Sequence, residues 1–110
     1  MSITSTLESN NKYYHNVNYD VLNVIPTDAQ TLLEVGCAAG PLARAYKEIN
    51  PNCHYTGVEL SDSAAQKASE ILDKVIVGNV EKMDNEALAI EPQSLDCIIY
   101  GDVLGSVVIF

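Results

Sequence analysis

The chain has 110 residues, a length that predicts a single domain, and its hydrophobic content of 47% is enough for one small core. Its formal net charge is −9, so it lacks the basic surface by which proteins bind nucleic-acid phosphates, and nucleic acid is not a favoured partner. The longest apolar run is too short to predict a membrane span.

The N-terminal region predicts a flexible segment followed by a helix. Residues 1–11 are rich in Ser, Thr and Asn and lack the features of a signal peptide, so we expect a flexible terminus before one domain at 12–110. Apolar residues then recur at helical spacing up to Pro26, which should end the helix; they are Tyr14, Val17, Val21, Val24 and Ile25.

The rest of the chain alternates apolar strands with helices. The strands are expected at 31–36, 54–60, 74–79 and 95–102. Helices are expected from Pro41 to Asn50, from the N-cap Ser61 through Leu72, and over 84–90. This order predicts an α/β fold, a Rossmann-like doubly wound parallel sheet of about four strands with helices on both faces.

The segment LLEVGCAAG, residues 32–40, leaves the first strand through two glycines and three small residues. Ligands of such sheets bind beyond the carboxyl ends of the strands, and glycine lets the backbone approach them closely. A structural turn explains the segment equally well when it is considered alone. Glu59 favours a ligand, because it ends the second strand 23 residues after Gly36. An acid about 20 residues after the turn binds ribose hydroxyls in these folds.

The dinucleotide pattern G-x-G-x-x-G does not fit this turn. When Gly36 is its first glycine, Ala38 and Pro41 occupy the other two positions. A nicotinamide oxidoreductase is therefore the weakest of the hypotheses.

The chain resembles the class I S-adenosylmethionine-dependent methyltransferases in four segments. LLEVGCAAG is similar to their first motif, with Ala38 in place of the middle glycine, and GVEL at 57–60 is similar to the second. VGNVEKMD at 77–84 and LDCIIYGDVL at 95–104 resemble the third motif and the fourth strand.

The resemblance implies S-adenosylmethionine as cofactor, with S-adenosylhomocysteine as product. Gly36 and its neighbours would pack on the methionine part, Glu59 would bind the ribose, and Asn79 and Val80 would meet the adenine. The cofactor-binding residues it implies are Glu34, Gly36, Cys37, Ala38, Gly40, Glu59, Leu60, Asn79, Val80 and Gly101. No catalytic residue is identified, and Asp102, Tyr13 and Tyr14 have structural explanations of equal weight.

The resemblance also implies that the chain is truncated after the fourth strand, because the family fold usually has seven strands. The edge of strand four would then be open, so that either the tail VVIF pairs with it or two chains self-associate there.

Two functions follow as hypotheses: a methyltransferase, or its cofactor-binding half, and a non-catalytic nucleoside-binding or assembly module. The methyl acceptor is expected to be a small molecule or a protein. The odd number of cysteines (Cys37, Cys53 and Cys97) without metal-ligand spacing predicts reduced thiols, a cytoplasmic location and no metal site.

Overall fold

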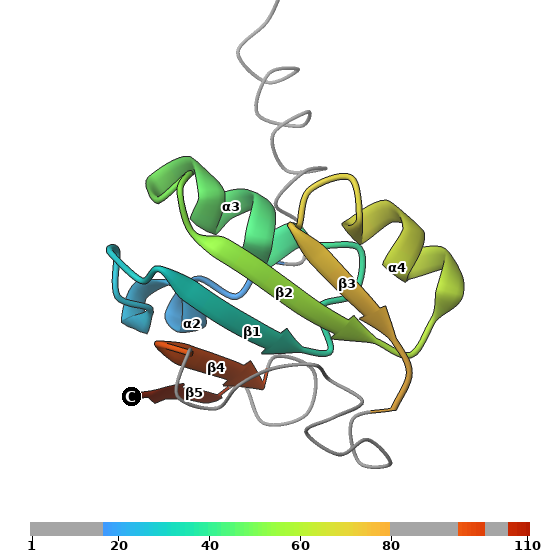
Figure 1. Cartoon of the computed structure of the whole chain (residues 1–110). Helices are drawn as coiled ribbons and strands as arrows, with labels where there is room; N and C mark the ends of the chain where they lie inside the picture. The colour runs from blue at the N-terminus through green and yellow to red at the C-terminus, as the bar shows by residue number, and fades with distance from the viewer. Residues whose placement is uncertain (1–16, 80–94, 101–105) are drawn as a thin grey trace, which may run out of the picture.

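The computed structural model describes residues 17–79, 95–100 and 106–110, and within them it shows one five-stranded sheet with the order β3-β2-β1-β4-β5 (Figure 1). The strands are β1 (Thr31–Val35), β2 (His54–Glu59), β3 (Lys74–Val77), β4 (Cys97–Tyr100) and β5 (Ser106–Ile109). The first four strands run parallel and β5 is antiparallel to β4. The predicted α/β fold class is confirmed.

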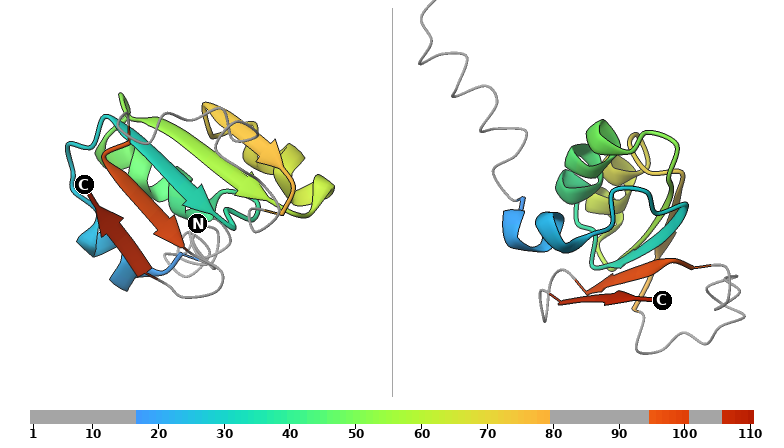
Figure 2. Two further views of the ribbon diagram at one scale, coloured as in Figure 1. Left: turned by 60° about the horizontal axis from the view of Figure 1, so that its bottom comes forward. Right: turned by 90° about the vertical axis from the view of Figure 1, so that its left-hand side faces the viewer.

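Three helices of the described part pack on one face of this sheet (Figure 2). They are α2 (Tyr19–Val24), α3 (Pro41–Ile49) and α4 (Asp62–Ala68). Helices on both faces were expected; the segment 84–90, the remaining expected helix, lies outside the described residues.

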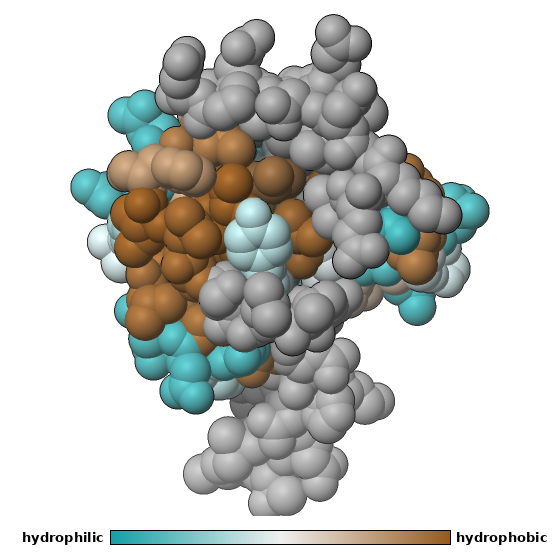
Figure 3. Space-filling model, turned by 90° about the horizontal axis from the view of Figure 1, so that it is seen from below, coloured by the Kyte–Doolittle hydropathy of each residue, from teal (hydrophilic) through white to brown (hydrophobic). Residues whose placement is uncertain are grey.

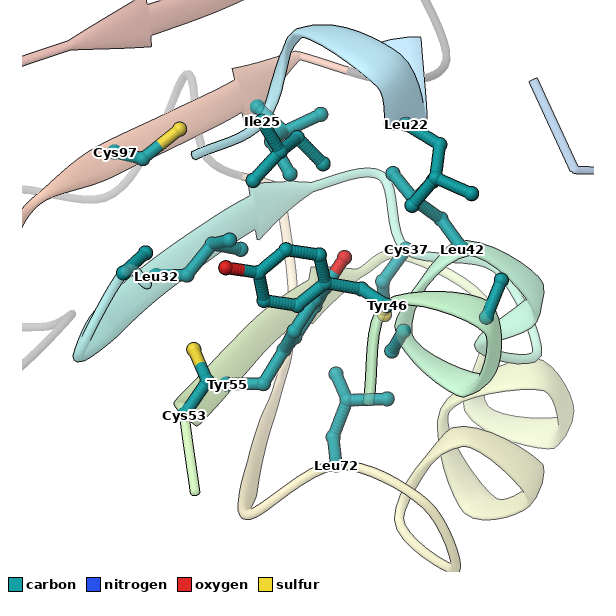
Figure 4. Close-up of a cluster of buried hydrophobic side chains, with 14 of the residues drawn as sticks. Leu22, Ile25, Leu32, Cys37, Leu42, Tyr46, Cys53, Tyr55, Leu72 and Cys97 are labelled. Carbon is teal, nitrogen blue, oxygen red and sulfur yellow. The ribbon is translucent and has the colours of Figure 1, made fainter. Parts of the chain in front are cut away.

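The core between the helices and the sheet is built around β1. Leu32 of β1, Tyr55 of β2 and Ile99 of β4 are fully buried in one cluster with Tyr46 of α3 (Figure 4). The two tyrosine rings lie 6.2 Å apart at a 55° tilt, and both hydroxyls are hydrogen-bonded. Tyr46 donates to the carbonyl oxygen of Pro26, so the end of α2 is tied to α3.

Local signals set the helix ends, with two differences from expectation. α3 follows Gly40, whose φ of 94° only glycine adopts without strain, and has Pro41 at its first position. α2 begins at Tyr19 with Asn18 as its N-cap, so Val17 precedes the helix that was predicted to contain it. α4 ends at Ala68 rather than at Leu72, because the N–H groups of Ile71 and Leu72 both donate to the carbonyl oxygen of Ala68 in a tight turn.

Pairing of the tail with the edge of strand four is confirmed, and the alternative, an exposed edge at which two chains associate, is wrong. Ser106 to Ile109 pair with Tyr100 to Cys97 along the whole of β4. The tail was one of the two expected occupants, and it excludes edge-to-edge pairing of two chains at β4. The edges of the described sheet are therefore β3 and β5.

Candidate functional site

The turn between β1 and α3 has an unusual backbone. Gly36, Ala38 and Gly40 have φ values of 77°, 52° and 94°, so three alternate residues lie in the left-handed region. The N–H groups of Gly36 and Cys37 both donate to the carbonyl oxygen of Val58, at 2.8 and 3.1 Å. The turn is thereby folded against the carboxyl end of β2.

Glu59 joins this turn to the start of α4. Its Oε1 accepts from the Ala38 N–H at 2.7 Å, and its Oε2 accepts from the Ser61 N–H at 2.9 Å. The side chain is only 8% exposed. Each carboxylate oxygen can accept more than one hydrogen bond, so a carboxylate fixed in this way can still receive two adjacent hydroxyls. The structure thus brings together the turn and the acid that the sequence singled out.

Cys37 contributes to the turn through its backbone, because its side chain lies in the core (Figure 4). The thiol packs over Gly57 in the middle of β2. A Cβ added at Gly57 would lie 2.6 Å from the Cys37 Sγ and 2.5 Å from Leu72 Cδ2. Because Gly57 has no side chain, Cys37 can pack directly against β2 and hold the turn there. Sequence reasoning missed Gly57, although glycine inside an apolar strand is a known sign of close approach.

Glu34 lies beneath the turn as a buried acid, 4% exposed, on the helix-covered face of the sheet. Tyr55 donates its hydroxyl to Glu34 Oε1 at 2.6 Å. Burial, and then the Glu34 carboxylate, raise the pKa of Tyr55 well above its ordinary 10, so the tyrosine remains a hydrogen-bond donor. Tyr55 was not among the predicted site residues, and only its place one strand away from Glu34 could have suggested it.

Of the remaining predicted residues the structure describes two, Leu60 and Asn79, at the ends of β2 and β3. Leu60 follows Glu59 and is 70% exposed. Asn79 follows Gly78, whose N–H donates to the carbonyl oxygen of Glu59 at 3.0 Å, so Asn79 lies close to the end of β2. Val80 and Gly101, like Asp102, Tyr13 and Tyr14, lie outside the described residues.

The charges of the site favour one class of ligand. Residues 31–40 and 54–60 contain no Lys or Arg, while Glu34 and Glu59 lie in or beside the turn. A pyrophosphate would meet no cationic side chain from these segments, whereas a cationic ligand would be attracted by the Glu59 carboxylate and, from within the core, by that of Glu34. Among residues 17–79, 95–100 and 106–110, no group of three His, Cys, Asp or Glu side chains could hold a metal ion. No helix in this part of the chain has the length and apolarity of a membrane span.

A family model described as "Methyltransferase domain" matches residues 33–107. No curated protein sequence matches the chain. The matched range runs from β1 to β5 and contains the turn, Gly57 and Glu59.

Solved structures with the same fold are similar at low identity. The plantazolicin methyltransferase BpumL, in complex with a pentazolic desmethylPZN analog and SAH, is 15% identical with a TM-score of 0.60, over 89% of this chain and 39% of that one. A putative methyltransferase in complex with the Haloferax volcanii Trm112 methyltransferase activator is 17% identical with a TM-score of 0.52, over 69% and 36%. The StiE O-MT, residues 942–1257, is 12% identical with a TM-score of 0.53, over 64% and 28%. The chain thus spans about two fifths or less of the length of these proteins.

Proposed function

Because the chain belongs to the methyltransferase domain family, we propose that it binds S-adenosylmethionine and serves methyl transfer to an acceptor. The observation that carries this proposal is the Glu59 carboxylate, which two backbone N–H groups hold in one orientation beside the left-handed turn. When bound, S-adenosylmethionine supplies a methyl group already activated on a sulfonium. The protein then mainly has to bind and orient the two partners.

The described residues divide this work among three positions. Glu59 accepts the two ribose hydroxyls, with its orientation fixed in advance by Ala38 and Ser61. The turn from Gly36 to Gly40 presents backbone, without large side chains, to the methionine part. Glu34, held by Tyr55, adds negative charge beneath the turn, which favours a cationic ligand over a dinucleotide. Asn79, and beyond the described residues Val80, are proposed to meet the adenine.

The acceptor is proposed to be a small molecule or a protein. The net charge of −9 supports this choice over nucleic acid. Among the similar structures, one methyltransferase is in complex with a desmethylPZN analog and another with the Trm112 activator. A cytoplasmic location is proposed on separate grounds: Cys37, Cys53 and Cys97 are buried and form no disulfide, which suits a reducing compartment.

Ligand titration tests the cofactor proposal. The chain is titrated with S-adenosylmethionine, S-adenosylhomocysteine and NAD, with calorimetry and the melting temperature as readouts. We expect the first two to bind and NAD not to bind. Glu59→Gln should weaken binding about tenfold or more, because a charged acceptor is lost for two hydroxyls. Glu70→Gln, which removes an exposed acid from the turn after α4, should leave the affinity unchanged. Equal affinity of wild type and Glu59→Gln would refute the assigned ribose contact.

A non-catalytic nucleoside-binding or assembly module is the second candidate. Transfer of a labelled methyl group to a panel of small-molecule and protein acceptors separates the two. Cofactor binding without transfer to any acceptor would support the module, and any transfer abolished by Glu59→Gln would support the enzyme.

A further inference from the structure

We propose that β5 is a self-pairing edge, at which two copies of the chain join their sheets by antiparallel pairing of β5 with β5 about a two-fold axis at Val108. The proposal does not depend on the proposed function. In the described sheet β5 is separated from Glu59 and β2 by β4 and β1.

The hydrogen-bond pattern of the β4–β5 ladder shows which backbone groups of β5 point away from β4. The Phe110 N–H donates to the carbonyl oxygen of Asp96 at 2.9 Å, so Phe110 and Asp96 form a hydrogen-bonded pair. Such pairs alternate with non-hydrogen-bonded ones along an antiparallel ladder. Val108 opposite Ile98 is therefore a bonded pair, whereas Val107 and Ile109 direct their N–H and C=O groups away from β4.

These outward groups are self-complementary. With the axis at Val108, Val107 of one copy lies opposite Ile109 of the other copy, and the same pairing repeats on the far side of the axis. Each of these pairs can exchange two backbone hydrogen bonds, while the two Val108 side chains meet on the axis. No side-chain pocket is needed, and a strand of four residues is long enough.

The amino-acid composition of the two edge strands favours β5 over β3 as the strand at which two copies pair. Protein sheets protect their edges with charged residues, especially lysine, and with proline. β3 begins with Lys74, directly after Asp73. Residues 106–110 contain no charged residue and no proline. Two chains of net charge −9 repel each other, and β5, which has no charged side chain, is where they can approach at low electrostatic cost.

The side chains on this edge are apolar and exposed. Val108, Ile109 and Phe110 are 43%, 56% and 69% exposed. Figure 3 shows apolar surface on the underside of the molecule, the side on which β4 and β5 lie in Figure 1. α2 contacts β5 and adds the exposed side chains of Tyr19 and Val24. Pairing of two copies covers part of this surface.

Sedimentation velocity and light scattering of the whole chain test the proposal. We expect a concentration-dependent species of twice the 11.9 kDa chain mass. Ile109→Pro removes an outward N–H without removing a bond to β4, and should weaken the dimer about tenfold or more. Ile109→Val keeps that N–H and should dimerise like the wild type. A monomeric wild type, or a dimer that survives Ile109→Pro in a protein that still melts cooperatively, overturns the proposal.

Charged substitutions at Val108 test the position of the two-fold axis. They also distinguish loss of the dimer by charge repulsion from loss by misfolding. Val108→Lys and Val108→Glu each place two like charges in contact on the axis, so each alone should be monomeric. A mixture of the two should form a heterodimer, because opposite charges then meet. Failure of the mixture to associate, when each variant alone is folded, contradicts an axis at Val108.

Discussion

The region from β1 to β3 and the pair of strands β4 and β5 belong to one sheet but are held in different ways. The first region has two helical crossovers and several buried polar contacts, among them those of Glu59 to Ala38 and of Tyr55 to Glu34. The second is held by its backbone ladders and by the buried side chains of Cys97 and Ile99. A polar side-chain contact to the first region is made by Asp96, which accepts from the N–H groups of Gln30 and Thr31 at 2.6 and 3.1 Å.

The difference separates two kinds of recognition. At the carboxyl ends of β1 and β2, side-chain oxygens in fixed positions form the proposed site for a small polar ligand. At the far edge of β5, backbone groups and aliphatic side chains can recognise only another strand. Substitutions in the first region should therefore alter ligand binding together with stability, and those at β5 should alter association.

Gly57→Ala should give the largest effect. The added Cβ would lie less than 3 Å from Leu72 Cδ2 and from two atoms of Cys37. Overpacking of this kind costs about 3 kcal/mol, and here it also displaces the turn that Cys37 anchors. We expect a much lower urea midpoint and loss of S-adenosylmethionine binding. The matched control is Ser69→Ala at the exposed end of α4. Equal urea midpoints for the two variants would contradict the close packing of Cys37 and Leu72 against Gly57.

Tyr55→Phe should have the next largest effect. It removes the donor to the buried Glu34 carboxylate and should destabilise the protein by about 2 kcal/mol. Tyr19→Phe is the matched control, because that ring is 54% exposed. Chemical denaturation at pH 7 measures both. If Tyr55→Phe is as harmless as Tyr19→Phe, the Tyr55 hydrogen bond does not stabilise the fold.

Alkaline pH should weaken both regions together, because each contains a buried thiol. Burial, which outweighs the nearby Lys47 at Cys53, raises the pKa of Cys53 and of Cys97 from 9.0 to about 11. The unfolded chain therefore loses these protons first, and stability present below pH 9 falls as the pH rises toward 11. Each thiol contributes a slope of up to about 1.4 kcal/mol per pH unit.

Urea midpoints between pH 8 and 9 measure this slope below most of the range in which tyrosines, with an ordinary pKa of about 10, ionise. Cys53→Ala and Cys97→Ala should each reduce it by about half, whatever their effect at pH 7. A slope that neither variant changes would mean that other groups cause the alkaline loss.

Ala38→Gly should give the smallest effect. Ala38 has a φ of 52°, which glycine adopts without the strain that a Cβ causes. We expect a gain of less than about 1 kcal/mol, because the greater freedom of glycine in the unfolded chain opposes the relief of strain. Ala64→Gly, within α4, should instead destabilise the protein. A loss of stability in Ala38→Gly comparable to that in Ala64→Gly would show that the turn does not strain Ala38.

The sequence allowed the first region to be predicted more fully than the second. Local signals marked the glycine turn, Pro41 as the start of α3, Ser61 as the N-cap of α4 and Glu59 at the end of β2. The contacts of Gly57 with Cys37 and of Tyr55 with Glu34 join residues about 20 positions apart, and no local pattern reveals them. The occupant of the β4 edge was equally hidden, since the apolar tail suits pairing with its own β4 or with another chain.

The central place of β1 also has a consequence for the order of folding. β1 pairs with β2 through a crossover of about 20 residues, but its pairing with β4 closes a loop in which the Asp96 contact to Thr31 spans 65 positions. Closing the longer loop costs more chain entropy, so the β1–β3 unit should form first and β4 should join it later. During synthesis on the ribosome, the proposed cofactor site at the ends of β1 and β2 would be assembled before β4 pairs with the other side of β1.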